Sequence, residues 1–193
     1  EQVMSLLKTM PIHAIKIGML GSSEIAEALI PILEGINVPV VIDPVRVATS
    51  GATLGHVDHL TMDRLIEQSS VITPNDDELL ALTGDTPPGR WAIDRGVAVL
   101  HTGGHGEGAK LHDVLWLPDG NHRRWSHPRV DTRHTHGSGC TLSTAVAVGL
   151  AQGLGLPDAV GEAIHYTTSL IVRSANQSLV ETNGPLLHFK RGE

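Results

Sequence analysis

Short apolar runs alternate with longer segments of helical periodicity along most of this chain. The runs at 12–17, 38–42, 70–73 and 96–100 are rich in Val and Ile, which is typical of strands buried inside a parallel sheet. The periodicity predicts helices at 1–10, 57–68, 76–82 and 158–173, one after Ser22 or Ser23, and one that carries Leu142 to Leu150. This alternation predicts an α/β fold, with a mostly parallel sheet and helices on both of its faces.

Three local patterns refine this expectation. In the helix after Ser22 or Ser23, the residues predicted to face inward are Ile25, Ala28, Leu29 and Ile32. Residues 112–117 and 121–128 flank Pro118-Asp119-Gly120, a turn signal that predicts a small antiparallel hairpin at a sheet edge. Pro87-Pro88-Gly89 is the most linker-like stretch, but it is too short to separate domains. Residues 1–193 are therefore predicted to form a single domain.

Composition excludes several classes of function. The net charge of −7 and the pI of about 5.9 argue against a nucleic-acid or anionic-membrane surface. No run of 18 apolar residues is present, and the single cysteine cannot form an internal disulfide, which fits a reducing cytosol. The 12 histidines are scattered without the spacing of a zinc site. A cytoplasmic protein without a nucleic-acid or membrane partner is therefore expected.

The chemistry concentrates in residues 131–153. Gly137-Ser138-Gly139-Cys140 immediately precedes the apolar positions of a helix. Glycines at this point allow a tight turn, so that unpaired N–H groups and the positive end of the helix dipole form an anion site. The same field favours the thiolate of Cys140. The alternative is a plain loop and helix cap, with the cysteine as a small buried hydrophobe.

The other polar or Gly-rich clusters also follow predicted strands. They are Gly18-Met19, Asp43, Asn75 and Gly103-Gly104. Because ligands of parallel α/β sheets bind at the carboxyl ends of the strands, these clusters and the Gly137 turn are predicted to form one site.

The longer string Thr-His-Gly-Ser-Gly-Cys-Thr-Leu-Ser at 135–143 resembles the signature of the hydroxymethylpyrimidine/phosphomethylpyrimidine kinases of thiamine biosynthesis, which are members of the ribokinase-like superfamily. Most of that superfamily has an Asp base at the last position of the turn, whereas this branch has Cys. The resemblance implies that Gly137, Ser138 and Gly139 hold the migrating phosphoryl group. Cys140 would then accept the proton of the substrate hydroxyl or orient that hydroxyl.

Shorter similarities imply the remaining roles. The segment at 41–51 resembles the family's V-x-D-P-V…A-K-S-G, with Thr49 in place of Lys, and Asn75 to Glu78 match N-x-x-E. Asp43 and Glu78 are therefore expected to organise Mg²⁺, and Val45 to contact the substrate. An alternative for Asn75 and Glu78 is a helix capping box.

Two more segments complete the expected site. His101 to His105 resembles V-K-G-G-H, with Thr102 in place of Lys, which implies that Asn75, Thr102, Gly103 and Gly104 bind ATP. The segment at 16–20 resembles K-I-G-M-L, which implies that Gly18 and Met19 contact the pyrimidine. Asp113 matches the Asp that follows this loop in the relatives, and a purely structural role is one interpretation of it.

The resemblance implies ATP-dependent phosphorylation of hydroxymethylpyrimidine and then of its monophosphate, with Mg²⁺. A pyridoxal kinase and a non-catalytic ligand-binding remnant are the alternatives. The two Lys-to-Thr differences favour the remnant, as does the missing A-G-S-D-x-S-G-G leading segment of the relatives. The chain is expected to be the carboxyl-terminal part of the family's domain. An unpaired sheet edge would then favour a homo-oligomer.

Overall fold

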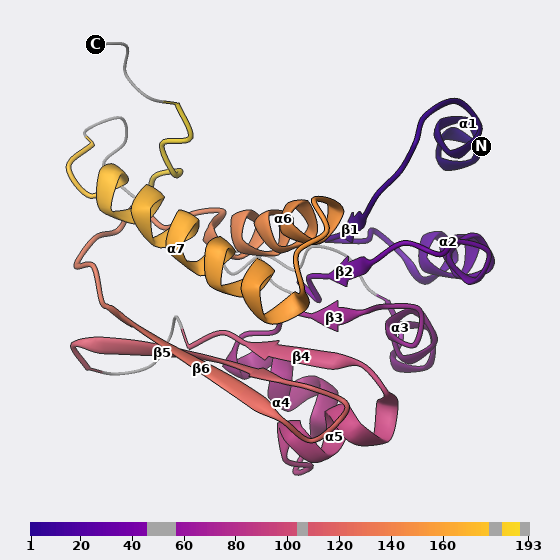
Figure 1. The fold of residues 1–193 in the computed structure, drawn as a ribbon, viewed down its shortest axis with the longest axis horizontal. Coiled ribbons are helices and arrows are strands. Elements are labelled where there is room, and N and C mark those ends of the chain that lie inside the picture. The colour runs from indigo at the N-terminus through magenta and orange to yellow at the C-terminus, as the bar shows by residue number, and fades with distance from the viewer. Residues whose placement is uncertain (46–56, 104–107, 178–182, 190–193) are drawn as a thin grey trace.

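The computed structural model describes residues 1–45, 57–103, 108–177 and 183–189. Its centre is a six-stranded sheet in the order β1-β2-β3-β4-β5-β6 (Figure 1). The strands are β1 (Ile15–Ile17), β2 (Val40–Ile42), β3 (Val71–Ile72), β4 (Ala98–His101), β5 (Lys110–Trp116) and β6 (His122–Pro128). The first four run parallel, and β5 and β6 continue the sheet as an antiparallel hairpin at its edge. The predicted mostly parallel sheet with an edge hairpin is confirmed.

Helices cover both faces of the sheet (Figure 1). They are α1 (Gln2–Thr9), α2 (Ser23–Glu34), α3 (His59–Ile66), α4 (Asp76–Thr83), α5 (Pro88–Arg95), α6 (Ser138–Ala151) and α7 (Leu156–Ser174). Residues of α2, α3 and α5 pack with Ile42, Ile72 and Val99 in one core cluster. Residues of α6 and α7 pack with Val41, Val71 and Leu100 in a second cluster on the other face. Successive strand residues point to opposite faces, so each β-branched run supplies both cores.

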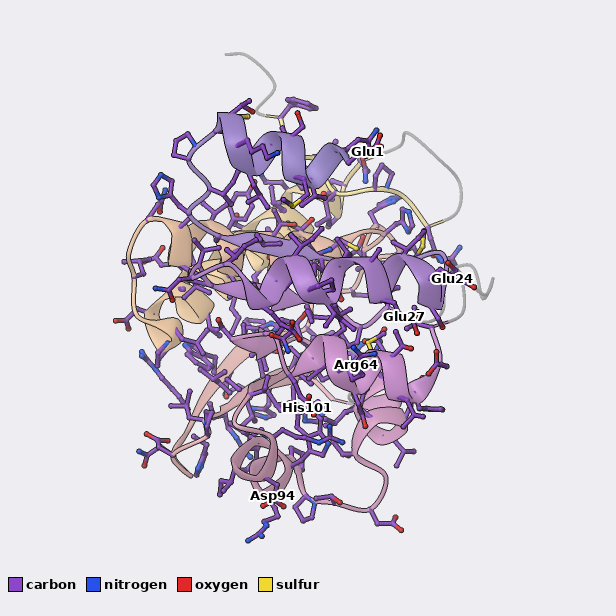
Figure 2. All side chains as sticks on the ribbon, turned by 90° about the vertical axis from the view of Figure 1, so that its right-hand side faces the viewer. Glu1, Glu24, Glu27, Arg64, Asp94 and His101 are labelled. Carbon is purple, nitrogen blue, oxygen red and sulfur yellow. The ribbon has the colours of Figure 1, made fainter. Side chains whose placement is uncertain are left out.

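The inward face predicted for α2 was wrong except at Leu29, which is partly buried against the core. The buried residues are Ala26, Ile30 and Leu33, whereas Ile25 is 49% exposed. Figure 2 shows Glu24 and Glu27 on the outer side of this helix. Apolar residues occupy more of the circumference of α2 than the sheet covers, so periodicity alone does not determine which stripe is buried.

Helix α5 was missed because its first residues resemble a linker. Pro88 occupies the first helical position, where its fixed φ suits a helix and its missing N–H costs nothing. Arg90 and Asp94 form an i,i+4 ion pair on the exposed side, while Trp91 and Ala92 are buried. The proline pair therefore starts a helix.

None of the helices in the described part of the chain is long and apolar enough to cross a membrane. Helix α1, as predicted from its periodicity, forms at the amino-terminal end, but it buries none of its residues. Figure 1 shows it set apart from the two helical layers.

Candidate active site

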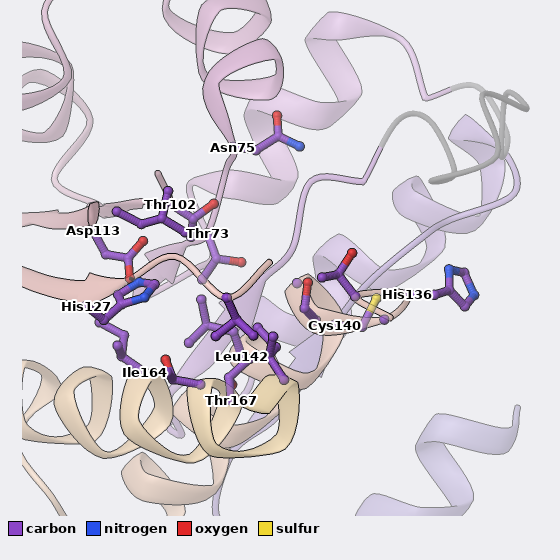
Figure 3. A pocket seen from close by; sticks show the side chains of 18 of the residues that line it. Thr73, Asn75, Thr102, Asp113, His127, His136, Cys140, Leu142, Ile164 and Thr167 are labelled. Atoms are coloured by element: carbon purple, nitrogen blue, oxygen red, sulfur yellow. Dashed lines mark hydrogen bonds and ion pairs between the residues drawn. The ribbon is translucent and has the colours of Figure 1, made fainter. Parts of the chain in front are cut away.

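A cavity of about 530 Å³ opens where β2, β3 and β4 end and α6 begins (Figure 3). The predicted site residues that line it are Asp43, Val45, Asn75, Glu78, Thr102, Gly137, Ser138, Gly139 and Cys140. Segments nearly one hundred residues apart in sequence thus contribute to one pocket, because parallel strands end at the same edge of the sheet.

Four predicted residues, Gly18, Met19, Gly103 and Gly104, are not placed in this lining. Met19 is 49% exposed, and neither it nor Gly18 lines the cavity. Gly104 lies outside the described residues, as does Thr49. The ligand-binding roles of Gly18, Met19 and Gly104 stay predictions.

The first turn of α6 has the geometry that the predicted anion site requires. Gly137, the N-cap residue, has φ +84°, a left-handed conformation that favours glycine. The N–H of Ser138 donates to the carbonyl of Thr135 at 3.1 Å, so only its hydroxyl is left for an anion. Helix geometry leaves the N–H groups of Gly139 and Cys140 without an intrahelical acceptor. These two N–H groups are the donors best suited to an anion.

Asp43 links this helix to the sheet. It is only 4% exposed, and its carboxylate lies 3.3 Å from the ammonium group of Lys16 and accepts a hydrogen bond of 3.1 Å from the Ser143 hydroxyl. Ser143 lies on α6 one turn after Cys140. The carboxylate is therefore neutralised from β1 and oriented from α6.

The ionisation expected of Cys140 is corrected by its surroundings. Although the residue is exposed overall, partial burial of the thiol raises its pKa above the ordinary value of 9.0, and the carboxylate of Asp43 raises it further. The Lys16 ammonium acts in the opposite direction but does not prevail. These contributions favour the protonated thiol over the thiolate that the helix end was expected to favour.

Asn75 and Glu78 form the capping box that was the alternative to a metal site. The Asn75 side chain accepts from the Glu78 N–H at 2.9 Å, and the Glu78 carboxylate accepts from the Asn75 N–H at 3.0 Å. Both residues also line the cavity. The cap holds Glu78 in the pocket wall, and its role toward a metal stays a prediction.

The oxygen donors present fit a hydrated Mg²⁺. Asp43 and Glu78 line the same cavity, and Mg²⁺ in phosphoryl-transfer sites is commonly held by one or two carboxylates while it keeps several waters. Among the residues that the structure describes, no group of three His, Cys, Asp or Glu converges on a point. The site therefore suits a cation shared with phosphate oxygens.

Sequence reasoning assigned no ligand-binding role to several polar residues of the cavity wall, namely Thr73, Asp113, His127 and Thr167. Nε2 of His127 donates to the Asp113 carboxylate at 3.0 Å, and the hydroxyls of Thr73 and Thr167 are buried without a hydrogen-bond partner among the described residues. All four line the cavity. The residue types carried no signal, because His127 belongs to an edge strand in which polar residues are ordinary.

Gly103 has a structural reason to be glycine. Its N–H donates to Asp113 at 3.0 Å, and a Cβ at this position would lie 2.1 Å from the carbonyl oxygen of His112. The close approach of the β5 backbone therefore requires glycine at this position, independently of any nucleotide binding. The predicted contact of Gly103 with ATP remains a prediction.

The sheet, the helical layers and the Gly-rich helix start at the strand ends define a ribokinase-like α/β protein. In agreement, the structure of pyridoxal kinase from Staphylococcus aureus in complex with AMP-PCP and pyridoxal has a TM-score of 0.80 to this chain. The two are 27% identical, and the match covers 96% of this chain and 70% of the kinase. A sequence profile of the family described as phosphomethylpyrimidine kinase matches residues 1–186, and the chain belongs to that family.

Two relatives show how much of a longer protein the chain matches. It is 38% identical to the hydroxymethylpyrimidine/phosphomethylpyrimidine kinase of Streptomyces coelicolor, with 88% of this chain and 66% of the relative covered. It is 32% identical to the thiamine biosynthesis multifunctional protein ThiED of Corynebacterium efficiens, with 98% of this chain and 27% of the relative covered. The chain thus spans just under two thirds of the first relative and about a quarter of the second. The predicted family is confirmed.

Proposed function

We propose that this chain catalyses transfer of the γ-phosphoryl group of ATP to the hydroxyl of hydroxymethylpyrimidine, and then to the resulting monophosphate. The observation that carries the proposal is the first turn of α6. Its Gly139 and Cys140 N–H groups meet the carboxylates of Asp43 and Glu78 in one cavity. Family membership and the name of the Streptomyces coelicolor relative support this substrate pair.

In this proposal the backbone of α6 stabilises the negative charge on the phosphoryl group during its transfer. The N–H groups of Gly139 and Cys140 and the Ser138 hydroxyl donate to the equatorial oxygens of the phosphoryl group. The substrate hydroxyl oxygen forms the new P–O bond as the bond to the ADP oxygen breaks. Because the transition state of phosphoryl transfer is loose, positioning and charge stabilisation contribute more than a strong base.

Cys140 has the role of orienting the substrate hydroxyl. A protonated thiol is a poor base, but it lies beside the anion site and within the influence of Asp43. The hydroxyl proton leaves late, after the new P–O bond has begun to form, and passes to an oxygen of the transferred group. This order of steps needs no thiolate in the resting enzyme.

ATP is proposed to lie along the strand ends, where Asn75 and Thr102 line the cavity and Gly103 and Gly104 follow β4. Mg²⁺, shared by Asp43, Glu78 and phosphate oxygens, would offset the negative charge of the donor. Thr49 and Thr102 stand where the family pattern has Lys, so this chain lacks two cations that relatives of that pattern possess. A slow turnover is therefore expected.

The test compares wild-type protein with Cys140→Ala and Cys140→Ser. Loss of the thiol should lower kcat steeply while calorimetric binding of ATP with Mg²⁺ stays nearly unchanged. Cys140→Ser, which restores a group able to orient the hydroxyl, should recover part of kcat. Equal activity of all three proteins would remove Cys140 from the reaction. ATP binding without turnover in the wild type would make the chain a nucleotide-binding remnant.

A pyridoxal kinase activity is the second candidate, because the S. aureus structure similar to this one contains pyridoxal. Both candidate substrates are six-membered nitrogen heterocycles with a hydroxymethyl group. Product assays with each compound, and with both in competition, separate the two. A higher kcat/KM for pyridoxal would favour this second candidate.

A further inference from the structure

The register of the hairpin places two ionisable residues on the same face. Asp113 of β5 pairs with Trp125 of β6, and His127 pairs with Leu111, so Asp113 and His127 are diagonal neighbours. Their side chains meet at 3.0 Å, with side-chain exposures of 7% for Asp113 and 19% for His127. Both line the cavity at the end away from Cys140 (Figure 3).

The carboxylate of Asp113 also holds the segment that follows β4. Its Oδ1 accepts from the Gly103 N–H at 3.0 Å, while Oδ2 contacts Nε2 of His127. Thr102, next to Gly103, is tied to the Pro74 carbonyl by its N–H at 3.0 Å. The segment at the end of β4 is therefore fixed between the neighbouring strand end and the hairpin.

A buried carboxylate in this wall raises an electrostatic problem. Charges inside a protein are tolerated when they are paired, and an unpaired carboxylate beside a polyanion repels it. Neighbouring Thr102 carries no charge. The hydrogen bond to the Asp113 carboxylate raises the pKa of His127 and so favours the imidazolium, whose positive charge offsets that of the carboxylate. Arg129 also lines this wall, and its Nε donates to the Gly108 carbonyl at 3.1 Å.

We propose that His127 is a positioning residue for the phosphate donor: it neutralises Asp113, so that Asp113 can hold the Gly103 N–H while the same wall accepts the anionic nucleotide. This inference rests on the proposed function, because it takes ATP as the occupant of the cavity. It adds two residues of the hairpin that act through the segment after β4 and not on the reacting atoms.

The experiment measures calorimetric affinity for ADP with Mg²⁺, together with kcat and KM for ATP, in three variants. His127→Gln keeps a hydrogen-bond donor near Asp113 but removes the charge. The double variant His127→Gln/Asp113→Asn removes both charges and keeps an acceptor for the Gly103 N–H. His112→Gln is the matched control, since His112 lies on the same hairpin, is exposed, and bonds to the Ser126 hydroxyl at 2.8 Å.

His127→Gln is expected to weaken ADP binding and to raise KM for ATP about ten-fold, with kcat within about two-fold of wild type. The double variant should return both constants to near the wild-type values, because no charge is left to neutralise. A purely structural role of His127 would not be rescued by the second substitution. His112→Gln should leave all constants unchanged.

Two results would overturn the inference, and they are distinguishable. If wild type binds ADP but His127→Gln binds it equally well, or if the double variant binds as weakly as the single one, only the role of His127 fails. If wild type binds no nucleotide at all, the proposed function fails and this inference fails with it.

Discussion

Replacing Gly103 by Ala should destabilise the protein even when no nucleotide is present. The added Cβ would lie 2.1 Å from the carbonyl oxygen of His112, 3.0 Å from its carbonyl carbon and 3.2 Å from its nitrogen. His112 is paired with Ser126 inside the hairpin, so the β5 backbone cannot yield easily. Since unstrained contacts of carbon lie at about 3.5 Å or more, the segment after β4 has to retreat by roughly 1 Å.

The displacement of this segment determines how much stability Gly103→Ala loses. The Gly103 N–H bond to Asp113, now 3.0 Å, would lengthen out of hydrogen-bonding range. Losing a hydrogen bond to a charged group costs about 1.5–3 kcal/mol, and forcing the backbone apart adds about 1 kcal/mol. The free energy of unfolding should therefore fall by about 3 kcal/mol.

Urea denaturation without nucleotide measures this change. Gly155→Ala is the control, because Gly155 has φ −63° and no atom within 4 Å of an added Cβ, so its effect should stay within about 1 kcal/mol. If Gly103→Ala is as stable as that control and loses only nucleotide binding, the glycine serves phosphate approach, and the argument from β5 packing is refuted.

Three further predictions concern the charges of the site. Lys16→Met leaves the Asp43 carboxylate buried without its cation and should cost about 3 kcal/mol or more in urea denaturation, much of it recovered by adding Asp43→Asn; a single variant as stable as wild type would contradict this. The rate of Cys140 alkylation by iodoacetamide should keep rising beyond pH 9, whereas a plateau near neutral pH would indicate a thiolate. The stability contributed by His127 should be complete below its unfolded pKa of about 6.5 and lost as pH rises through its raised folded pKa. The stability gap between wild type and His127→Gln should accordingly narrow from pH 6 to 9, and a constant gap would exclude the coupling.

The strands and most helices followed from the sequence because their signals are local. The run from Val38 to Ile42 is rich in β-branched residues, which favour a strand, and it contains β2. Pro118-Asp119-Gly120 specifies the hairpin turn. Where two local meanings compete, the sequence is ambiguous. Pro87-Pro88-Gly89 reads as a linker or as a helix start, and only the burial of Trp91 against the sheet distinguishes them.

The position of the site was also predictable, whereas the ionisation of its groups was not. Asp43, Asn75 and Cys140 each follow a recognisable pattern, and the rule that parallel strands end at one edge places them together. The pKa of Cys140 depends on its burial and on its approach to Asp43, which lies 97 residues away in sequence. No local sequence pattern specifies that Cys140 and Asp43 lie close together in the fold.

The sequence by itself determined the order of the strands and of every helix except α5, the Gly137 turn and the family to which its motifs belong. These depend on backbone preferences and on the spacing of neighbouring residues. The tertiary structure decided which stripe of α2 is buried, that Lys16 neutralises Asp43, and that Asp113 and His127 pair across the hairpin. Such contacts depend on the register between strands and on the distance between charges in a low-dielectric interior, and these exist only once the chain has folded.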